Sequence, residues 1–210
     1  MIKVLIADDH TIVREGLKQI LSESSDIIAS GEARNGKEVL NKIIKNDYDV
    51  VLLDISMPGR GGIDILKEIK SIKPKLSVLI LSMYPEEQYA VRALKTGASG
   101  YLTKESASDE LINAIRKVYL GGKYISSTLA EKLAFYLEND IERTPHDKLS
   151  NREFHVMCMI ASGKTVNKIA EELSLSPKTI STYRSRILEK MKMKTNAELI
   201  HYAIKNRLVF

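Results

Sequence analysis

Residues 50–58 read VVLLDISMP, an apolar run of strand length that ends in a single carboxylate, Asp54. Residues 3–10, KVLIADDH, repeat this pattern and end in two acids, Asp8 and Asp9. Short apolar runs rich in β-branched residues are typical of strands that are buried on both faces of a parallel sheet. Two such strands that end in acids indicate either solvated strand ends or one acidic site.

The strand pattern recurs along the first 120 residues, and helix-like stretches separate the runs. Five strands that alternate with five helices predict a doubly wound α/β fold with a five-stranded parallel sheet. In this fold ligands bind at the carboxyl ends of the strands. The predicted strands cover residues 4–7, 27–29, 50–53, 78–81 and 99–102. The first two helices are predicted to bury Ile12, Leu17, Ile20 and Leu21, then Val39, Leu40, Ile43 and Ile44.

Charge divides the chain of 210 residues into two parts. Residues 1–120 carry 17 Lys and Arg against 17 Asp and Glu, whereas residues 148–210 carry 12 against 5. A basic segment attached to a neutral one indicates a separate module that faces a polyanion, although a solvated basic surface gives the same count. The sequence therefore predicts a domain over residues 1–120, a linker over residues 121–147 with one helix (residues 128–137), and a domain over residues 148–210.

The composition argues against a membrane-bound or secreted protein. No apolar run approaches the ~18 residues of a membrane span. The short run VLIA before two aspartates is not a secretory signal. The single cysteine, Cys158, rules out an internal disulfide and fits a reducing compartment. We therefore expect a cytoplasmic protein that has no membrane partner.

Five polar residues fall at or just past the carboxyl ends of predicted strands. Asp8, Asp9 and Asp54 should converge there, because the ends of parallel strands lie at one edge of a sheet. Converged carboxylates repel one another unless a cation intervenes, and a cluster of hard oxygen ligands suits Mg²⁺. Ser82 and Lys104 follow two further strands. A hydroxyl and an ammonium beside metal-bound carboxylates predict a site for a phosphoryl group.

At these positions the sequence resembles the receiver domains of response regulators, over about residues 1–120. The paired acids DD, then DISMPGRGGID, LILSMY and GASGYLTKESA carry the resemblance in matching order and spacing. It implies that Asp54 accepts a phosphoryl group from a sensor histidine kinase. It also implies that the cofactor is Mg²⁺, held by Asp8, Asp9, Asp54 and the backbone carbonyl of Ser56.

The resemblance gives roles to three further residues. Lys104 would pair with the phosphoryl oxygens, Ser82 would swing to hydrogen-bond them, and Tyr101 would be a switch aromatic that turns inward when Ser82 moves. Many receivers have a proline after the lysine, often with a cis bond, and here Glu105 follows Lys104. Because a cis bond without proline costs about 3 kcal/mol, we expect a trans bond, and the KES form marks a subfamily.

Each of these residues also has an ordinary structural role. Asp54 could cap a strand, Ser82 could form a turn, Lys104 could be a surface charge, and Tyr101 could pack as a half-buried strand residue. Five coincident strand ends favour the functional interpretation. Haloacid-dehalogenase-type phosphatases also use an aspartate nucleophile, but they need a second carboxylate two residues on, where this chain has Ser56. We therefore predict a phosphoryl acceptor and not an enzyme; a regulator that binds DNA without phosphorylation is the other alternative.

From residue 149 onward the pattern is helical. Ser150 and Glu153 form a capping box, Thr165 begins a second helix, and Ser176 begins a third. Two short helices joined by a tight turn predict a helix-turn-helix. Residues 148–210 resemble the LuxR-type helix-turn-helix of the NarL/FixJ response regulators.

The resemblance makes residues 167–173 the supporting helix and residues 177 to about 190 the recognition helix. Ser181, Thr182 and Ser185 lie opposite the apolar positions, on the face that a major-groove reader presents to base edges. Hydroxyl groups both donate and accept, so the preferred base stays open. The predicted DNA-binding residues, including the flanking phosphate contacts, are Lys178, Thr179, Ser181, Thr182, Tyr183, Arg184, Ser185 and Arg186.

The sequence thus predicts a DNA-binding transcriptional response regulator of a two-component system. The resemblance implies a homodimer when the protein is phosphorylated, formed through the last helix (residues 195–206) with Leu199, Ile200 and Ala203 at the interface. Two recognition helices would then read two half-sites in double-stranded promoter DNA. RNA polymerase is a further candidate partner.

Overall fold

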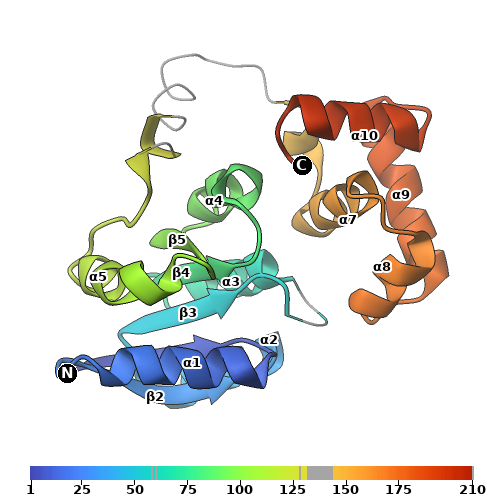
Figure 1. The fold of residues 1–210 in the computed structure, drawn as a ribbon. Coiled ribbons are helices and arrows are strands. Elements are labelled where there is room, and N and C mark those ends of the chain that lie inside the picture. The colour runs from blue at the N-terminus through green and yellow to red at the C-terminus, as the bar shows by residue number, and fades with distance from the viewer. Residues whose placement is uncertain (58, 60, 128, 132–143, 210) are drawn as a thin grey trace. The chain divides into compact units, whose positions relative to one another are not determined.

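The computed structural model describes residues 1–57, 59, 61–127, 129–131 and 144–209. The chain forms two compact units, Met1–Glu131 and Lys132–Phe210 (Figure 1). The predicted linker, residues 121–147, spans the boundary between these units, and most of its predicted helix, residues 128–137, lies outside the described residues. Within the described ranges, no helix combines the length and the apolar character needed to cross a membrane.

The first unit is built on a five-stranded sheet in which every pair of neighbours is parallel. The strand order is β2-β1-β3-β4-β5, so the chain winds in one direction from β1 to β2 and in the other from β1 through β3 to β5. This confirms the predicted doubly wound fold. The strands are β1 (Ile2–Ala7), β2 (Ile27–Ala33), β3 (Val50–Asp54), β4 (Ser77–Ser82) and β5 (Gly100–Thr103).

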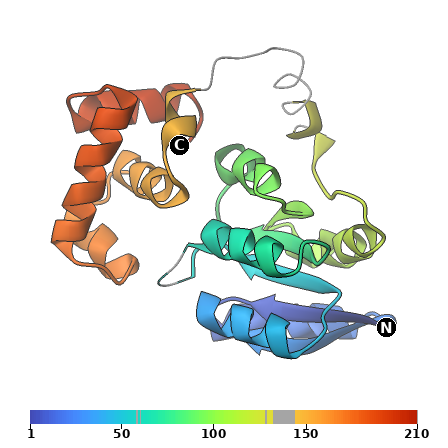
Figure 2. The same cartoon turned by 180° about the vertical axis from the view of Figure 1, so that it is seen from behind.

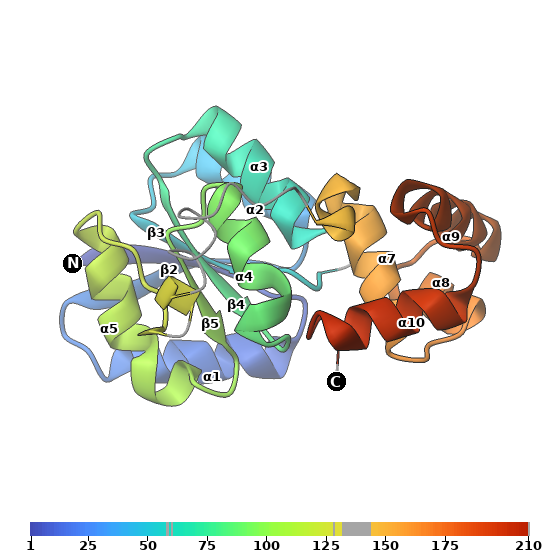
Figure 3. The ribbon, with the colours of Figure 1, turned by 90° about the horizontal axis from the view of Figure 1, so that it is seen from above.

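Helices cover both faces of this sheet, which explains why its strands are apolar runs without alternation. The helices α1 and α5 pack on one face, where a core of aliphatic residues from β1, β3 and β4 meets them (Figure 1). The helices α2 and α3 lie on the opposite face, as the reverse view and the view from above show (Figures 2 and 3). The helices are α1 (Thr11–Ser22), α2 (Gly36–Lys45), α3 (Gly62–Ile72), α4 (Glu86–Lys95) and α5 (Ala107–Tyr119).

Two residues of the predicted apolar helix faces do not enter the core. Leu17 and Leu21 of α1 are buried, but Ile12 is exposed; Val39 of α2 is buried, but Ile44 is exposed. In both helices the exposed isoleucine is five positions from a buried residue. Five positions correspond to a rotation of about 140° around a helix, so these side chains point away from the sheet.

The second unit consists of helices that begin where the sequence predicts. The side chains of Ser150, Thr165, Ser176 and Thr195 each accept a hydrogen bond from the backbone N–H three residues on. A short turn joins α8 to α9, which confirms the predicted helix-turn-helix. The elements are η1 (Pro145–Lys148), α7 (Asn151–Ala161), α8 (Val166–Glu172), α9 (Pro177–Met191) and α10 (Asn196–Lys205).

Candidate acidic site and nucleic-acid interface

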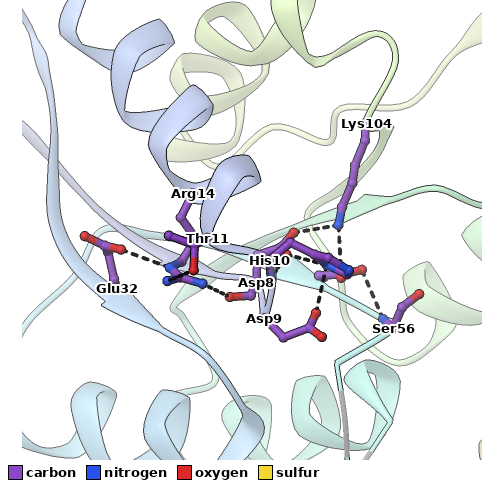
Figure 4. A network of polar contacts seen from close by, with 9 residues as sticks. Asp8, Asp9, His10, Thr11, Arg14, Glu32, Ser56 and Lys104 are labelled. Carbon is purple, nitrogen blue, oxygen red and sulfur yellow. Dashed lines mark hydrogen bonds and ion pairs between the residues drawn. The ribbon is translucent and has the colours of Figure 1, made fainter. Parts of the chain in front are cut away.

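The predicted acids meet at one edge of the sheet. Asp8 follows β1 and Asp54 ends β3, and these two strands are neighbours in the sheet. One ligand atom from each of Asp8, Asp9, His10 and Asp54 lies within 4.8 Å of the others. Figure 4 labels Asp8, Asp9 and His10 of this cluster. Asp8 and Asp54 are only 1% exposed, so their charges are largely removed from water. The two sequence stretches therefore build one site and not two separate strand ends.

Lys104 completes the charge arrangement of this site. Its Nζ atom lies 2.6 Å from Asp8 Oδ2 and 3.0 Å from Asp54 Oδ2, and its side chain is 9% exposed. Three carboxylates and one ammonium leave two negative charges, which is the charge that a divalent cation would balance. The convergence of the acids and the lysine is thus a feature of the folded chain, as their positions at strand ends predict.

Burial acts in opposite directions on the acid and the base. Burial raises the pKa of Asp54, although the charge of Lys104 and the backbone N–H of Ser56 partly offset this. Burial also lowers the pKa of Lys104, but the charge of Asp54 and the contact with Asp8 outweigh it, so that this pKa is raised. Burial thus disfavours the charged form of Asp54, and Lys104 offsets part of this cost.

The oxygen atoms of the site fit a hard cation. Asp8 Oδ2 and Asp9 Oδ1 are buried and accept no hydrogen bond from the described residues, although each has an ion-pair neighbour, Lys104 or His10. Ser56 lies beside them, because its backbone N–H donates to Asp54 Oδ1 at 3.0 Å. Buried carboxylate oxygens with open lone pairs are the ligands that Mg²⁺ takes in proteins. The site can therefore hold a divalent cation of this kind.

Two residues at the site had no predicted role. His10 is the N-cap of α1, and its backbone N–H donates to Asp8 Oδ1 at 2.8 Å. Its imidazole Nδ1 lies 3.1 Å from Asp9 Oδ1. Arg14 is buried one turn into α1 and donates to the backbone carbonyl of Asp8. Adjacency to the acid pair was the only sequence signal for His10. Nothing in the local pattern marks Arg14.

Ser82 and Tyr101 lie together beneath the loop that follows β4. Ser82 Oγ accepts a hydrogen bond from the backbone N–H of Tyr84 at 3.0 Å, and the hydroxyl of Tyr101 donates to the carbonyl of Tyr84 at 2.7 Å. Burial raises the pKa of Tyr101, and a hydrogen bond with Ser82 partly opposes this. The backbone N–H of Tyr101 donates to the carbonyl of Tyr124, just after α5. Tyr101 is fully buried and so occupies the inward position.

The recognition helix α9 has one buried and one exposed face. Ile180 and Ile187 are buried, whereas Ser181, Thr182 and Ser185 are exposed on the other side. The hydroxyls of Thr182 and Ser185 donate to the backbone carbonyls four residues earlier, at 3.0 and 3.1 Å. Their oxygen lone pairs therefore point outward as acceptors.

The predicted phosphate contacts differ in how free their side chains are. Lys178 and Arg186 are exposed, and Thr179 and Tyr183 are partly buried. Arg184 is also partly buried, because its Nε donates to Asn196 Oδ1 at the start of α10 at 2.7 Å. One donor of the Arg184 guanidinium is thus used in a hydrogen bond within the second unit.

Two of the three predicted dimer residues on α10, Leu199 and Ala203, need correction, whereas Ile200 stays a prediction. Leu199 and Ala203 are fully buried and Ile200 is partly buried, because this face of α10 packs against α7. A side chain that fills its own core cannot also form an interface between copies. Ile204 is a large apolar residue of α10 at the surface, with 56% of it exposed.

A parallel α/β unit with converged acids, joined to a helix-turn-helix unit, defines a DNA-binding response regulator. Residues 4–116 match the response regulator receiver domain, and residues 147–203 match the luxR family of bacterial regulatory proteins. The chain therefore belongs to the two-component response regulators that carry a receiver domain and a LuxR-type helix-turn-helix.

Characterised relatives span nearly the whole chain. The response regulator UvrY of Escherichia coli is 39% identical over 209 residues, which cover 99% of this chain and 96% of UvrY. GacA of Pseudomonas syringae is 37% identical over 210 residues, which cover 100% of this chain and 98% of GacA. RcsB of Salmonella enterica serovar Typhimurium, solved on the promoter rprA with the phosphomimetic BeF₃⁻, has a TM-score of 0.65 at 26% identity. That match covers 96% of this chain and 97% of the RcsB chain.

Proposed function

We propose that this regulator is switched by transfer of a phosphoryl group from a sensor histidine kinase to Asp54. The observation that carries the proposal is the position of Asp54, buried at a strand end with Lys104 Nζ at 3.0 Å. In the transfer, a carboxylate oxygen of Asp54 forms a bond to phosphorus while the bond between phosphorus and the histidine nitrogen of the kinase breaks. The product is an acyl phosphate on Asp54 and a histidine side chain on the kinase.

The residues around Asp54 stabilise the transferred group. Lys104 is placed to pair with phosphoryl oxygens once the charge of Asp54 is spread over the larger group. Asp8, Asp9 and Asp54, with the carbonyl of Ser56, would hold Mg²⁺, which when bound offsets the negative charge of the phosphoryl oxygens. Ser56 has no acidic side chain to protonate a leaving group, so we infer a phosphoryl acceptor and not a phosphatase.

The arrangement of Ser82 and Tyr101 supports a route for the switch. When Ser82 turns to the phosphoryl group, its present hydrogen bond to Tyr84 is lost, and Tyr84 also accepts from Tyr101. Tyr101 is in turn bonded through its backbone to Tyr124, which belongs to the first unit and to the predicted linker segment, residues 121–147. Phosphorylation would then shift the population of conformers at this segment without creating a new fold.

We infer that the second unit binds promoter DNA as a homodimer. The exposed hydroxyls of α9 face base edges, Lys178 and Arg186 are free for phosphates, and the outward side of α10 with Ile204 supplies the dimer surface. RcsB, a structural relative, was solved as dimers bound to DNA. RNA polymerase remains a candidate partner at such a promoter, and a regulator with these partners acts in the cytoplasm.

The test of the proposal is phosphoryl uptake from acetyl phosphate, a donor that bypasses the kinase. Wild-type protein should be labelled only with Mg²⁺ present, and Asp54→Asn should not be labelled. Lys104→Ala should be labelled to some extent but should not gain DNA affinity. Asp47→Asn is the matched control, because Asp47 is 97% exposed and outside the site. Undiminished labelling of Asp54→Asn would remove Asp54 from this role, and full DNA binding by that variant would favour regulation without phosphorylation.

A further inference from the structure

Arg14 is a charged side chain in an unexpected place. It projects from α1 into the first unit and is only 2% exposed, the largest of the fully buried side chains of the described residues. Burying a guanidinium costs several kcal/mol unless hydrogen bonds and opposite charges compensate for its lost hydration. An apolar side chain of similar size would fill this volume at lower cost, so the cation at this position calls for a reason beyond packing.

Among the described residues, Arg14 bonds to the backbone of the acidic site, to β2 and to the start of α1. Its Nη1 donates to the backbone carbonyl of Asp8 at 2.9 Å, its Nε to Glu32 Oε2 at 3.0 Å, and its Nη2 to Thr11 Oγ1 at 3.2 Å (Figure 4). Glu32 belongs to β2, and Thr11 is the first residue of α1. The guanidinium therefore ties the end of β1 to the neighbouring strand and to the helix that follows it.

The carbonyl of Asp8 needs such a donor because the sheet does not supply one. Pairing of β1 with β2 ends at Ala7 and Ala33, and the N–H of Asp8 makes the last bond, to the carbonyl of Ala33 at 3.0 Å. Beyond this point the chain turns into α1, which leaves a buried acceptor at the strand end. Arg14 satisfies that acceptor.

With this bond in place, Asp8 is held at three points. Its N–H is bound to Ala33, its carbonyl to Arg14, and its side-chain Oδ1 to the N–H of His10 at 2.8 Å. The remaining oxygen, Oδ2, is buried and accepts no hydrogen bond from the described residues, with the ammonium of Lys104 as its ionic neighbour. Arg14 thus fixes the backbone from which the Asp8 carboxylate projects.

We propose that Arg14 is a positioning residue for the divalent cation of the acidic site. It acts through Asp8 without contacting the cation, and its rigid fork sets the position and direction of the Asp8 carboxylate. Lysine cannot replace it, because one ammonium does not present donors to Glu32 and to the Asp8 carbonyl in fixed directions. The proposal rests on the function proposed above, since it assigns a role to Arg14 in that same site.

The ratio of the affinities for Mg²⁺ and Ca²⁺ is a measurement that a change in protein stability alone does not alter. Mg²⁺ requires near-ideal octahedral geometry with short bonds, whereas Ca²⁺ accepts longer and more variable bonds. A site with a loosened Asp8 should therefore lose more affinity for Mg²⁺ than for Ca²⁺. A purely structural role for Arg14 would reduce stability and leave the ratio of the two affinities unchanged.

The experiment is calorimetric titration of the full-length protein with each cation, for the variants Arg14→Lys and Arg14→Met. We expect the dissociation constant for Mg²⁺ to rise about tenfold, as is typical when a residue that orients a ligand is lost. The constant for Ca²⁺ should rise less than about threefold. Thermal unfolding in EDTA shows that each variant is folded, and Arg14→Lys carries the test if Arg14→Met does not fold.

Two matched control variants distinguish the loss of the Arg14 contact with Asp8 from the loss of one positive charge. Lys18→Met removes a cation that pairs with the other oxygen of Glu32 at 2.9 Å but does not reach Asp8. Arg116→Met removes a surface arginine whose partner is Asp26, outside the acidic site. Both controls should bind Mg²⁺ as the wild type does.

The outcomes distinguish this proposal from the proposed function. An unchanged Mg²⁺ constant in Arg14→Lys, or an equal loss for both cations, would overturn the positioning role. Loss of Mg²⁺ binding in Lys18→Met as severe as in Arg14→Lys would also overturn it, since net charge would then explain both. If the wild type bound no Mg²⁺ while Asp54 still took up phosphoryl, the metal site would fail and the phosphoryl acceptor would stand.

Discussion

In the receiver unit Lys104 is 9% exposed and lies between two carboxylates that are 1% exposed, whereas Lys178 and Arg186 of the second unit are exposed on a helix surface. The difference fits the ligand that we propose for each unit. A phosphoryl group needs charges fixed around one point with little water between them. The phosphates of DNA are spread along a groove and are met by exposed cations whose binding releases counterions.

Buried charges in the first unit and exposed charges in the second place different demands on the stability of each unit. The charges of the acidic site are held close together against the cost of burial, so the backbone that carries them must be rigid. The charges of α9 cost little when the protein is free, and its fold depends instead on caps and an apolar face. Perturbing the backbone should therefore disturb the first unit far more than the second.

The largest expected effect comes from Gly62→Ala at the start of α3. A Cβ at Gly62 would lie 2.4 Å from Ile55 Cα and 2.5 Å from the carbonyl oxygen of Asp54, and these are backbone atoms at the end of β3. Because they cannot move aside as a side-chain tip can, we expect the free energy of unfolding to fall by about 3 kcal/mol. Uptake of phosphoryl should fall with it, since Asp54 is displaced. Chemical denaturation and acetyl phosphate labelling measure the two effects.

Two other glycines serve as comparisons for Gly62. Gly163 closes α7 in the second unit with φ +81° and has nothing within 4 Å of a Cβ, so Gly163→Ala should cost only the left-handed strain of about 1–2 kcal/mol. Gly16 lies within α1 and is equally open, so Gly16→Ala should stabilise the protein by ~1 kcal/mol. A Gly62→Ala variant as stable as Gly163→Ala would contradict the rigidity of the site.

The effect of intermediate size is the loss of DNA affinity when a cation or a hydroxyl residue of α9 is replaced. Arg186→Ala should weaken binding to specific and random duplexes alike and reduce the salt slope by about 0.9 for a lost phosphate contact. Thr182→Ala and Ser185→Ala should cost ~1–3 kcal/mol on the true site and little on random DNA. Because both hydroxyls already donate within the helix, the bases they contact should present donors, adenine N6 or cytosine N4.

Titration of each variant against both duplexes over a range of salt tests these expectations. Equal weakening of both duplexes by Thr182→Ala would show that the hydroxyl face reads no sequence. Arg184→Ala should differ from Arg186→Ala, because it also breaks the bond to Asn196 and so lowers the stability of the second unit. Loss of DNA affinity without loss of stability in Arg184→Ala would mean that its contact with Asn196 is dispensable.

The smallest expected effect compares two buried carboxylates in EDTA as pH falls from neutral. The pKa of Asp54 is raised, chiefly by burial, so its ionised form is less stable in the folded chain than in the unfolded chain. Asp54→Asn should therefore raise the melting temperature at neutral pH. The difference in melting temperature from the wild type should shrink as acid protonates the Asp54 carboxylate of the wild type.

Glu153 of α7 should behave in the opposite way. Burial alone would raise its pKa, but Lys190 and the capping bonds of Ser150 overcome this, so its pKa lies below the usual value. Its contribution to stability is therefore present at neutral pH and is lost as pH falls through its folded pKa. Glu153→Gln should lower stability by ~1 kcal/mol at pH 7, and this loss should vanish in acid. Calorimetric melts from neutral pH to well below the usual glutamate pKa of 4.5 give both curves, and stability changes of the same sign for the two variants would contradict this difference.

Local patterns of residues were enough to predict the class of the protein. Apolar runs and helix caps are local signals, and they set the five strands, the helix starts at Ser150, Thr165 and Ser176, and the helix-turn-helix. The acids converged as predicted because the topology of a doubly wound sheet brings all strand ends to one edge. Asp8, Asp54 and Lys104 could therefore be assigned to one site from the sequence.

Which helix faces are exposed and which are buried depends on how the elements pack in the folded chain. Leu199 looks like any apolar residue of an amphipathic helix, yet it packs on α7, while Ile12 with the same local pattern is exposed. In the sequence, Arg14 is indistinguishable from the other members of the 32 Lys and Arg. In the folded chain it contacts the end of β1. Burial and hydrogen-bond partners depend on elements far apart in the chain, and no local pattern of residues contains that information.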